Sequence, residues 1–248
     1  MNRIFTLAAA GALVVSALSA QAQIAVDGVI NAAEIGPTAG KYTSLGAFTP
    51  AHVGSAGFGL AGLLRLYGAN SSTKLYVGLA GTMEASRNNF QLWLDLPGRT
   101  GVPAGTALPS IAGTSTVFGT FSGGSIGGTK MDMDVDAAIA TTGQGDVFAA
   151  VYSSATTAVA KSLGDGLSTT VTSDGVPGTI GAAQTTGVYS LFAGTRVAYL
   201  APNGDITANP GNANGGGAGS DALEYEFDRT ALGLPSGASV VRLMAAYV

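Results

Sequence analysis

Hydrophobic and polar residues alternate with a period of two in several short runs of this chain. The runs 74–82 and 89–96 each place apolar side chains on one face, namely Leu75, Val77 and Leu79, then Phe90, Leu92, Leu94 and Leu96. Alternation of this kind predicts a β-strand with one side turned to a core. The polar stretch between the two runs has the length of a hairpin loop, so we expect the two strands to pair.

Further strand-like runs follow, separated by turns rich in Gly, Pro, Asn and Asp. They cover residues 61–68, 131–140, 147–154, 188–194, 195–200, 222–227 and 240–248. In 222–227 the apolar side chains alternate with Glu224 and Glu226, and Asp228 and Gly233 have the places of the N-cap and the end of one helical turn. Many short strands predict an all-β fold, an antiparallel β-sandwich of jelly-roll type with long loops rich in Gly, Thr and Ser.

The first residues have the layout of a secretory signal peptide. Arg3 supplies a positive charge, residues 5–18 are apolar, and Ala-Gln-Ala at 20–22 is a small-x-small cleavage site. The apolar run is too short for a membrane-spanning helix, and no later segment is long and apolar enough for one. We therefore expect a leader at 1–22, with a buried N-terminal helix as the alternative, and a single mature domain at 23–248, secreted or at the surface of a bacterial cell.

The last apolar run reaches the final residue, Val248. An exported protein that stops within a strand is unusual. This ending indicates either a truncated chain or a strand that closes the sheet.

Composition narrows the classes of function. Charged residues make up 10% of the chain, against about 25% in ordinary domains, and the net charge is -4. The 11 basic residues form no cluster, which argues against nucleic acid and against an anionic membrane surface as partners. Cysteine is absent, and His52 is the single histidine. Disulfides and thiolate metal sites are therefore excluded, and neither a Ser-His-Asp triad nor a zinc centre is indicated.

Four segments together resemble a known group of sandwich domains. They are the Asp27-Gly28 turn with Glu34 after it, the LYVGLAG run at 75–81, the NNFQLWLDLPGRTG run at 88–101, and LEYEFDRTALGLP at 223–235. This set is similar to the domains of carbohydrate-binding module family 9 and the DOMON group, and above all to secreted bacterial sandwich proteins of unknown function. The resemblance implies a β-sandwich, and it suggests a sugar ligand stacked on aromatic side chains.

The candidate ligand site is an aromatic platform around the single tryptophan. Trp93 lies on the side of its strand opposite Phe90, together with Gln91 and Asp95. If the expected hairpin forms, Tyr76 stands beside Trp93 on that same side. Aromatic faces pack against the C–H surface of sugars while amides and carboxylates bind the hydroxyls, so an exposed platform predicts glycan binding. The competing interpretation is that both sides of the strand are covered and Trp93 is packed.

Two rows of carboxylates are the candidate metal residues. Asp132, Asp134 and Asp136 form one row, and Glu224, Glu226 and Asp228 form the other. Carboxylates without nearby cations favour Ca²⁺, but alternate residues of a strand lie about 6.5–7 Å apart. Solvated outer faces are therefore the stronger interpretation. The loop residues Asn203 and Asp205, with Asn209 and Asn212, are a weaker calcium candidate, and no other cofactor is expected.

We therefore expect an exported, non-enzymatic sandwich module that binds polysaccharide or associates with the cell surface. The alternative is a structural or adhesive extracellular protein that associates with itself. Its basis is the low charge, the abundance of Gly, Ala and Thr, and a chain that ends on an apolar strand. A glycoside hydrolase, which needs only two carboxylates, is a third and more distant candidate.

Overall fold

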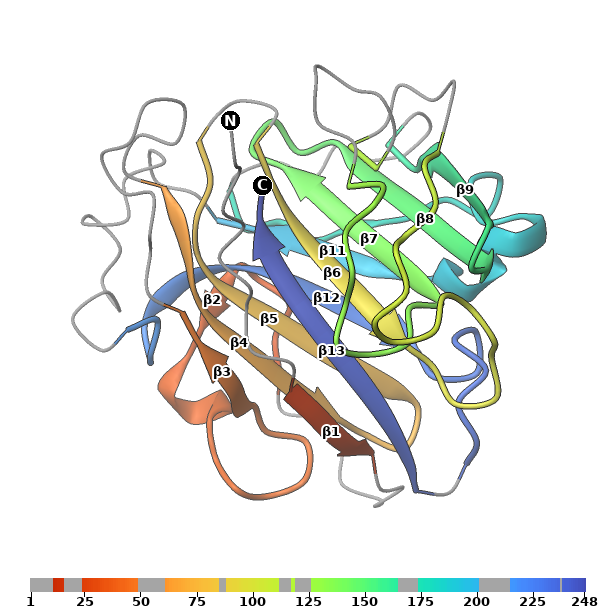
Figure 1. Cartoon of the computed structure of the whole chain (residues 1–248). Helices are drawn as coiled ribbons and strands as arrows, with labels where there is room; N and C mark the ends of the chain where they lie inside the picture. Colours follow the sequence, from red (N-terminus) through yellow and green to blue (C-terminus); the bar gives the residue numbers. More distant parts are fainter. Residues whose placement is uncertain are drawn as a thin grey trace.

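The computed structural model describes residues 24–48, 61–84, 88–111, 117–118, 126–164, 174–200, 215–236 and 238–248, and the backbone of 11–15. These residues form two antiparallel β-sheets packed face to face (Figure 1). Helical structure in the described part is limited to two 3-10 segments, Ala32–Glu34 and Gly187–Phe192. The predicted all-β sandwich is confirmed.

The larger sheet has seven strands in the order β10-β11-β12-β5-β4-β3, with β2 paired to β12 beside this row. The strands are β10 (Gly178–Thr179), β11 (Arg196–Tyr199), β12 (Ser220–Asp228), β5 (Lys74–Thr82), β4 (Gly62–Asn70), β3 (Thr43–Ala47) and β2 (Val29–Ile30). Four of its six pairings join strands that are consecutive in the sequence. The two pairings between distant segments are both made by β12, with β5 and with β2.

The second sheet has the order β1-β13-β6-β7-β8-β9, six strands with β1 and five without it. The strands are β1 (Gly11–Val15), β13 (Ser239–Tyr247), β6 (Asn89–Asp95), β7 (Ala137–Thr142), β8 (Val147–Ser154) and β9 (Thr157–Ser162). The last strand of the described structure, β13, pairs with β1 on one side and with β6 on the other.

The expected hairpin of residues 74–96 is wrong. β5 pairs with β4 and β12, whereas β6 pairs with β13 and β7 in the opposite sheet. The stretch between β5 and β6 therefore crosses from one sheet to the other. The alternation correctly identified the inward side of each strand, because Leu75, Val77, Phe90 and Leu92 all lie in the core between the sheets.

Three apolar layers replace the single core expected from the alternation. The central layer lies between the sheets. A second layer covers the outer side of the six-stranded sheet and includes Trp93, Met244 and Tyr152 together with residues from 102–135. A third covers the outer side of the seven-stranded sheet, where the segment 24–42 packs against β5. Both outer faces are therefore buried over much of their area by the chain itself.

Three local predictions need correction or refinement. Residues 131–136 are irregular, and only the second half of the predicted strand 131–140 forms β7. The run 188–194 is largely the second 3-10 segment and not a strand. Residues 228–233 form a turn in which the Asp228 carboxylate accepts the N–H groups of Thr230 and Ala231, at 2.8 and 3.1 Å, and Gly233 has a φ of 75°. The capping roles of Asp228 and Gly233 are thus confirmed, although the turn is not a regular helix.

The strand β1 lies inside the predicted leader. It pairs antiparallel with β13 from Gly11 opposite Leu243 to Val15 opposite Ser239. The five described residues, 11–15, are a strand and not part of a helix. Removal of the leader stays a prediction. Within the described ranges, no helix has both the length and the apolar character needed to cross a membrane.

Candidate functional site

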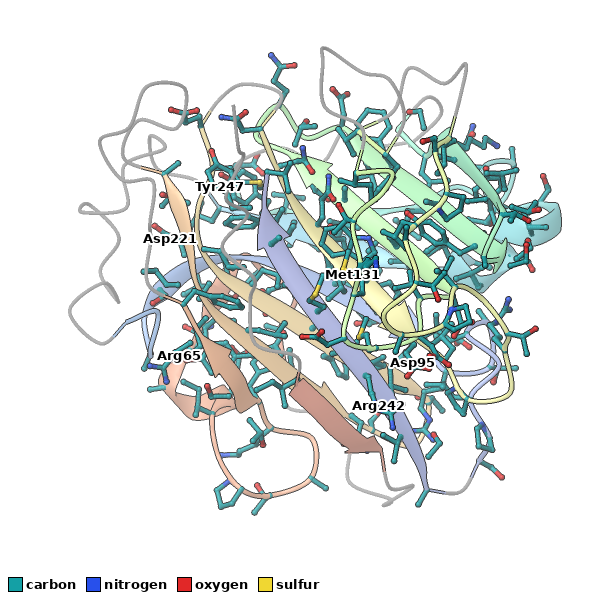
Figure 2. All side chains as sticks on the ribbon, viewed as in Figure 1. Arg65, Asp95, Met131, Asp221, Arg242 and Tyr247 are labelled. Carbon is teal, nitrogen blue, oxygen red and sulfur yellow. The ribbon has the colours of Figure 1, made fainter. Side chains whose placement is uncertain are left out.

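The Trp93 side chain is packed, with 2% of its surface exposed, and Gln91 beside it is fully buried. The cover is the second apolar layer, to which 102–111 and 126–135 contribute Val102, Leu108, Ile111, Ile126, Met131, Met133 and Val135. In Figure 2 the labelled Met131 lies over this side of the sheet. The interpretation in which both sides of the strand are covered is therefore the correct one for Trp93.

Tyr76 does not stand beside Trp93. It lies on the outer side of the other sheet and belongs to the third apolar layer, where burial and then the charge of Glu226 raise its pKa to about 12. Asp95 is half-buried at the far end of β6, and its carboxylate accepts a hydrogen bond from the Arg242 guanidinium at 2.7 Å (Figure 2). The four residues of the expected platform are thus not brought together.

The acidic residues 132, 134 and 136 do not converge either. The Asp136 carboxylate is 1% exposed and accepts the N–H of Leu96 at 2.7 Å, and burial raises its pKa. Asp134 accepts the N–H of Ala104 at 2.8 Å, while Asp132 is exposed. Two of the three therefore fasten the segment 96–104 to the chain that precedes β7. Within the described ranges, no three acidic or histidine side chains are grouped to hold a metal ion; Asn203 and Asp205 lie outside those ranges, as do Asn209, Asn212 and His52.

One acidic side chain that the sequence interpretation placed in solvent is buried and hydrogen-bonded on both oxygens. Glu224 on β12 is 0% exposed. Its Oε1 accepts the hydroxyl of Tyr42 at 2.7 Å, and its Oε2 accepts the backbone N–H groups of Asp27 and Gly28 at 3.0 and 2.8 Å. The expectation of a solvated row of Glu224 and Glu226 is wrong, because the N-terminal segment folds back over this side of the sheet.

The Asp27-Gly28 turn makes this arrangement possible. The Asp27 carboxylate accepts the N–H of Val29 at 3.1 Å, and Gly28 has a φ of 82°. A Cβ atom at Gly28 would lie 2.6 Å from the backbone nitrogen of Leu200. Position 28 is therefore restricted to glycine by its backbone conformation and by the close approach of Tyr199 and Leu200 at the end of β11.

Glu34, the acidic residue of the same N-terminal motif, has a similar role. Its Oε1 accepts the N–H of Ala25 at 2.7 Å, and its Oε2 accepts the N–H of Asn31 at 2.9 Å. Burial raises the pKa of Glu34, and burial raises the pKa of Glu224 to about 8. The two carboxylates hold 25–31 against the seven-stranded sheet, and their lone pairs are engaged by the chain itself, so this site has the features of a structural clasp.

Glu226 takes part in ion pairs at the rim of the same sheet. Its carboxylate lies 3.0 Å from Arg196 and 3.5 Å from Lys74, and Lys74 also lies 3.6 Å from Asp228. The Lys74 and Arg196 side chains are more than a quarter exposed, so these pairs contribute little to stability. They neutralise the carboxylates that the sequence suggested as calcium ligands.

The strand β13 lies at the side of the sandwich where β1 contacts strands of both sheets. Val241 and Leu243 of β13 face the central core, and Leu45, Phe48 and Tyr247 pack partly buried at its margin. The strand β1 lies along this side and contacts β3 and β4 as well as β13 (Figure 1). The strand that flanks β13 on this side therefore lies within the predicted leader.

No protein-family model matches the chain, and a search of curated proteins found no similar sequence.

Proposed function

We propose that this chain is an exported, non-catalytic β-sandwich module of the bacterial cell surface, which acts by association through its strand edges and loops. The observation that carries the proposal is the burial of both outer faces by the chain's own segments. In a sandwich whose outer faces are covered in this way, the strand edges and connecting loops are the surfaces available for contact with other molecules.

The polar groups of the described structure support a non-catalytic role. The buried carboxylates Glu34, Asp136 and Glu224 each accept backbone N–H groups, and Glu224 also accepts the Tyr42 hydroxyl. A general acid or base needs to reach a proton on its substrate, whereas these carboxylates are enclosed and fasten one part of the chain to another.

Self-association is the form of this function that the geometry favours. Edge strands offer unpaired backbone groups that recruit other strands, unless charges or covering segments protect them. β13 becomes an edge strand once the leader with β1 is removed. It carries one charged side chain, Arg242, among nine residues, and the net charge of -4 gives weak repulsion between copies.

Glycan binding is the second candidate, and it comes from the resemblance to carbohydrate-binding module family 9 and the DOMON group. The resemblance is supported by the sandwich and by the structural use of Gly28, Glu34 and Glu224 in its N-terminal and C-terminal motifs. The aromatic platform expected from the sequence is not formed, because Trp93 is buried and Tyr76 lies on the outer side of the other sheet. A glycan site would have to be formed by loops.

Export and processing are tested together by producing the full chain in a bacterial host, fractionating the cells and sequencing the N-terminus of the product. We expect a chain that begins at Gln23 in the periplasmic, surface or medium fraction. A cytoplasmic product that keeps Met1 would contradict the proposal. Retention on a panel of insoluble polysaccharides then separates the two forms of the function, since a self-associating protein without glycan affinity should not be retained.

A further inference from the structure

The outer edge of β13 is covered in this structure by a segment that the mature protein is predicted to lose. Five residue pairs join β1 to β13, and β1 also contacts β3 and β4 of the other sheet. The edge of β13 therefore accepts an extended antiparallel strand. Cleavage after residue 22 removes that strand, and it leaves the backbone groups of 239–243 unpaired at the margin of the central core.

The mature N-terminus cannot take the place of β1. The first described residues after the cleavage site are held on the outer face of the seven-stranded sheet, with the N–H of Ala25 bound to Glu34 and the N–H groups of Asp27 and Gly28 bound to Glu224. Val26 and Ile30 are buried in the third apolar layer. The new N-terminus is therefore anchored away from β13, so a strand that pairs with this edge has to come from another molecule.

The chemistry of the edge suits a second copy of itself. β13 is a nine-residue strand of Ser, Val, Leu, Met, Ala and Tyr with one charge, and the Arg242 guanidinium is already neutralised by Asp95 at 2.7 Å. Val240 exposes 45% of its surface on this strand. Two β13 strands related by a two-fold axis run antiparallel, the direction in which β1 binds, and present the same surface to each other.

We propose that removal of the leader exposes the edge of β13, and that two mature chains then pair antiparallel through this edge to join their smaller sheets into one continuous sheet. The inference rests on the proposed function for the cleavage of the leader and for self-association, and it adds the surface and the geometry of the pairing. In the precursor the same edge is occupied by β1, so the leader keeps the chain monomeric until export.

The test uses the processed chain purified after export, with its N-terminus confirmed by sequencing, and measures its mass by light scattering over a range of concentrations. We expect twice the mass of one chain at high concentration. Val240→Asp places a charge on the proposed edge and should return the protein to a monomer. The matched control is Val188→Asp, because Val188 is 51% exposed in the second 3-10 segment, outside this edge, and its variant should pair like the wild type.

A synthetic peptide of residues 9–17 supplies a third measurement, since it contains the β1 strand. Added to the processed chain, it should bind the free edge and dissociate the dimer. A processed wild-type chain that stays monomeric would overturn the inference while leaving export and surface location intact. Pairing that survives in Val240→Asp and is insensitive to the peptide would also overturn it, and would place self-association on another surface. A chain that keeps its leader would instead contradict the proposed function itself.

Discussion

The buried Glu224 carboxyl predicts that this protein is more stable in mild acid than at neutral pH. Burial raises its pKa from an ordinary 4.5 to about 8 in the folded protein. Below pH 4.5 the group is neutral in both states. Between pH 4.5 and about 8 the unfolded chain releases the proton that the folded chain retains, so unfolding becomes steadily more favourable as the pH rises. Above pH 8 both states are ionised, and the loss is complete.

The size of the effect follows from the same two values. Each pH unit over which only the unfolded state is ionised costs about 1.4 kcal/mol, so the interval from 4.5 to 8 corresponds to an upper value of about 5 kcal/mol. In a chain of this length, 1 kcal/mol shifts the melting temperature by roughly 2–4 °C. The wild type should therefore melt on the order of 10–20 °C lower at pH 8 than at pH 4.5 from this group alone.

Glu224→Gln isolates the contribution of this one group. The amide oxygen still accepts the N–H groups of Asp27 and Gly28, and the amide nitrogen donates to the Tyr42 hydroxyl, but the side chain no longer titrates. Urea unfolding of both proteins from pH 4.5 to 8.5 should show the wild type losing stability relative to Glu224→Gln as the pH rises. The exposed Asp132→Asn is the control and should follow the wild type. A constant difference between wild type and Glu224→Gln over this range would refute the assignment of Glu224 as a carboxyl kept neutral by burial.

Three further substitutions test the structural roles assigned above. Trp93→Ala should lower the free energy of unfolding by about 3–5 kcal/mol in urea titration, because it empties a buried site, and it should leave any glycan retention unchanged; loss of retention with unchanged stability would restore the platform. Gly28→Ala should destabilise by more than about 1 kcal/mol, whereas Gly105→Ala, with a similar φ of 73° and no atom within 4 Å of the added Cβ, should cost about 1 kcal/mol at most; equal losses would show that the close approach is unimportant. Asp136→Ala should lower the free energy of unfolding by about 1–3 kcal/mol, because the N–H that Asp136 binds is left unpaired. The control Asp132→Ala should change it by no more than about 0.5 kcal/mol. Added Ca²⁺ should not change the melting temperature of the wild type or of either variant, whereas a calcium-dependent rise that Asp136→Ala removes would show a metal site.

The sequence predicts the strands and their inward faces well, because a period of two is a local property. Leu223, Tyr225 and Phe227 turn inward on β12 as the alternation requires. Pairing is not local: β6 is bound by β13, whose Met244 lies opposite Trp93 about 150 residues further along the chain. Alternation predicts which side of a strand is apolar, but it does not predict which strand pairs with it.

The sequence does contain an indication that the outer faces are buried. β5 reads Leu-Tyr-Val-Gly-Leu-Ala-Gly after Lys74, without a charge on either side, and a strand that is apolar on both sides is typical of burial on both faces. Glu224 had no such signal, because its environment depends on Asp27 and Gly28, almost 200 positions earlier. The carboxyl group is buried where distant backbone N–H groups bind it, and no local pattern contains that information.

Amide hydrogen exchange along β13 tests the central claim most directly. In the processed chain, the amides of residues 239–243 that face away from β6 should exchange quickly at low concentration and become protected as the concentration rises, because the edge pairs with a second copy. Val240→Asp should keep them unprotected at every concentration. Protection that is strong at all concentrations, or absent at all of them, would contradict an edge that leader removal opens for assembly.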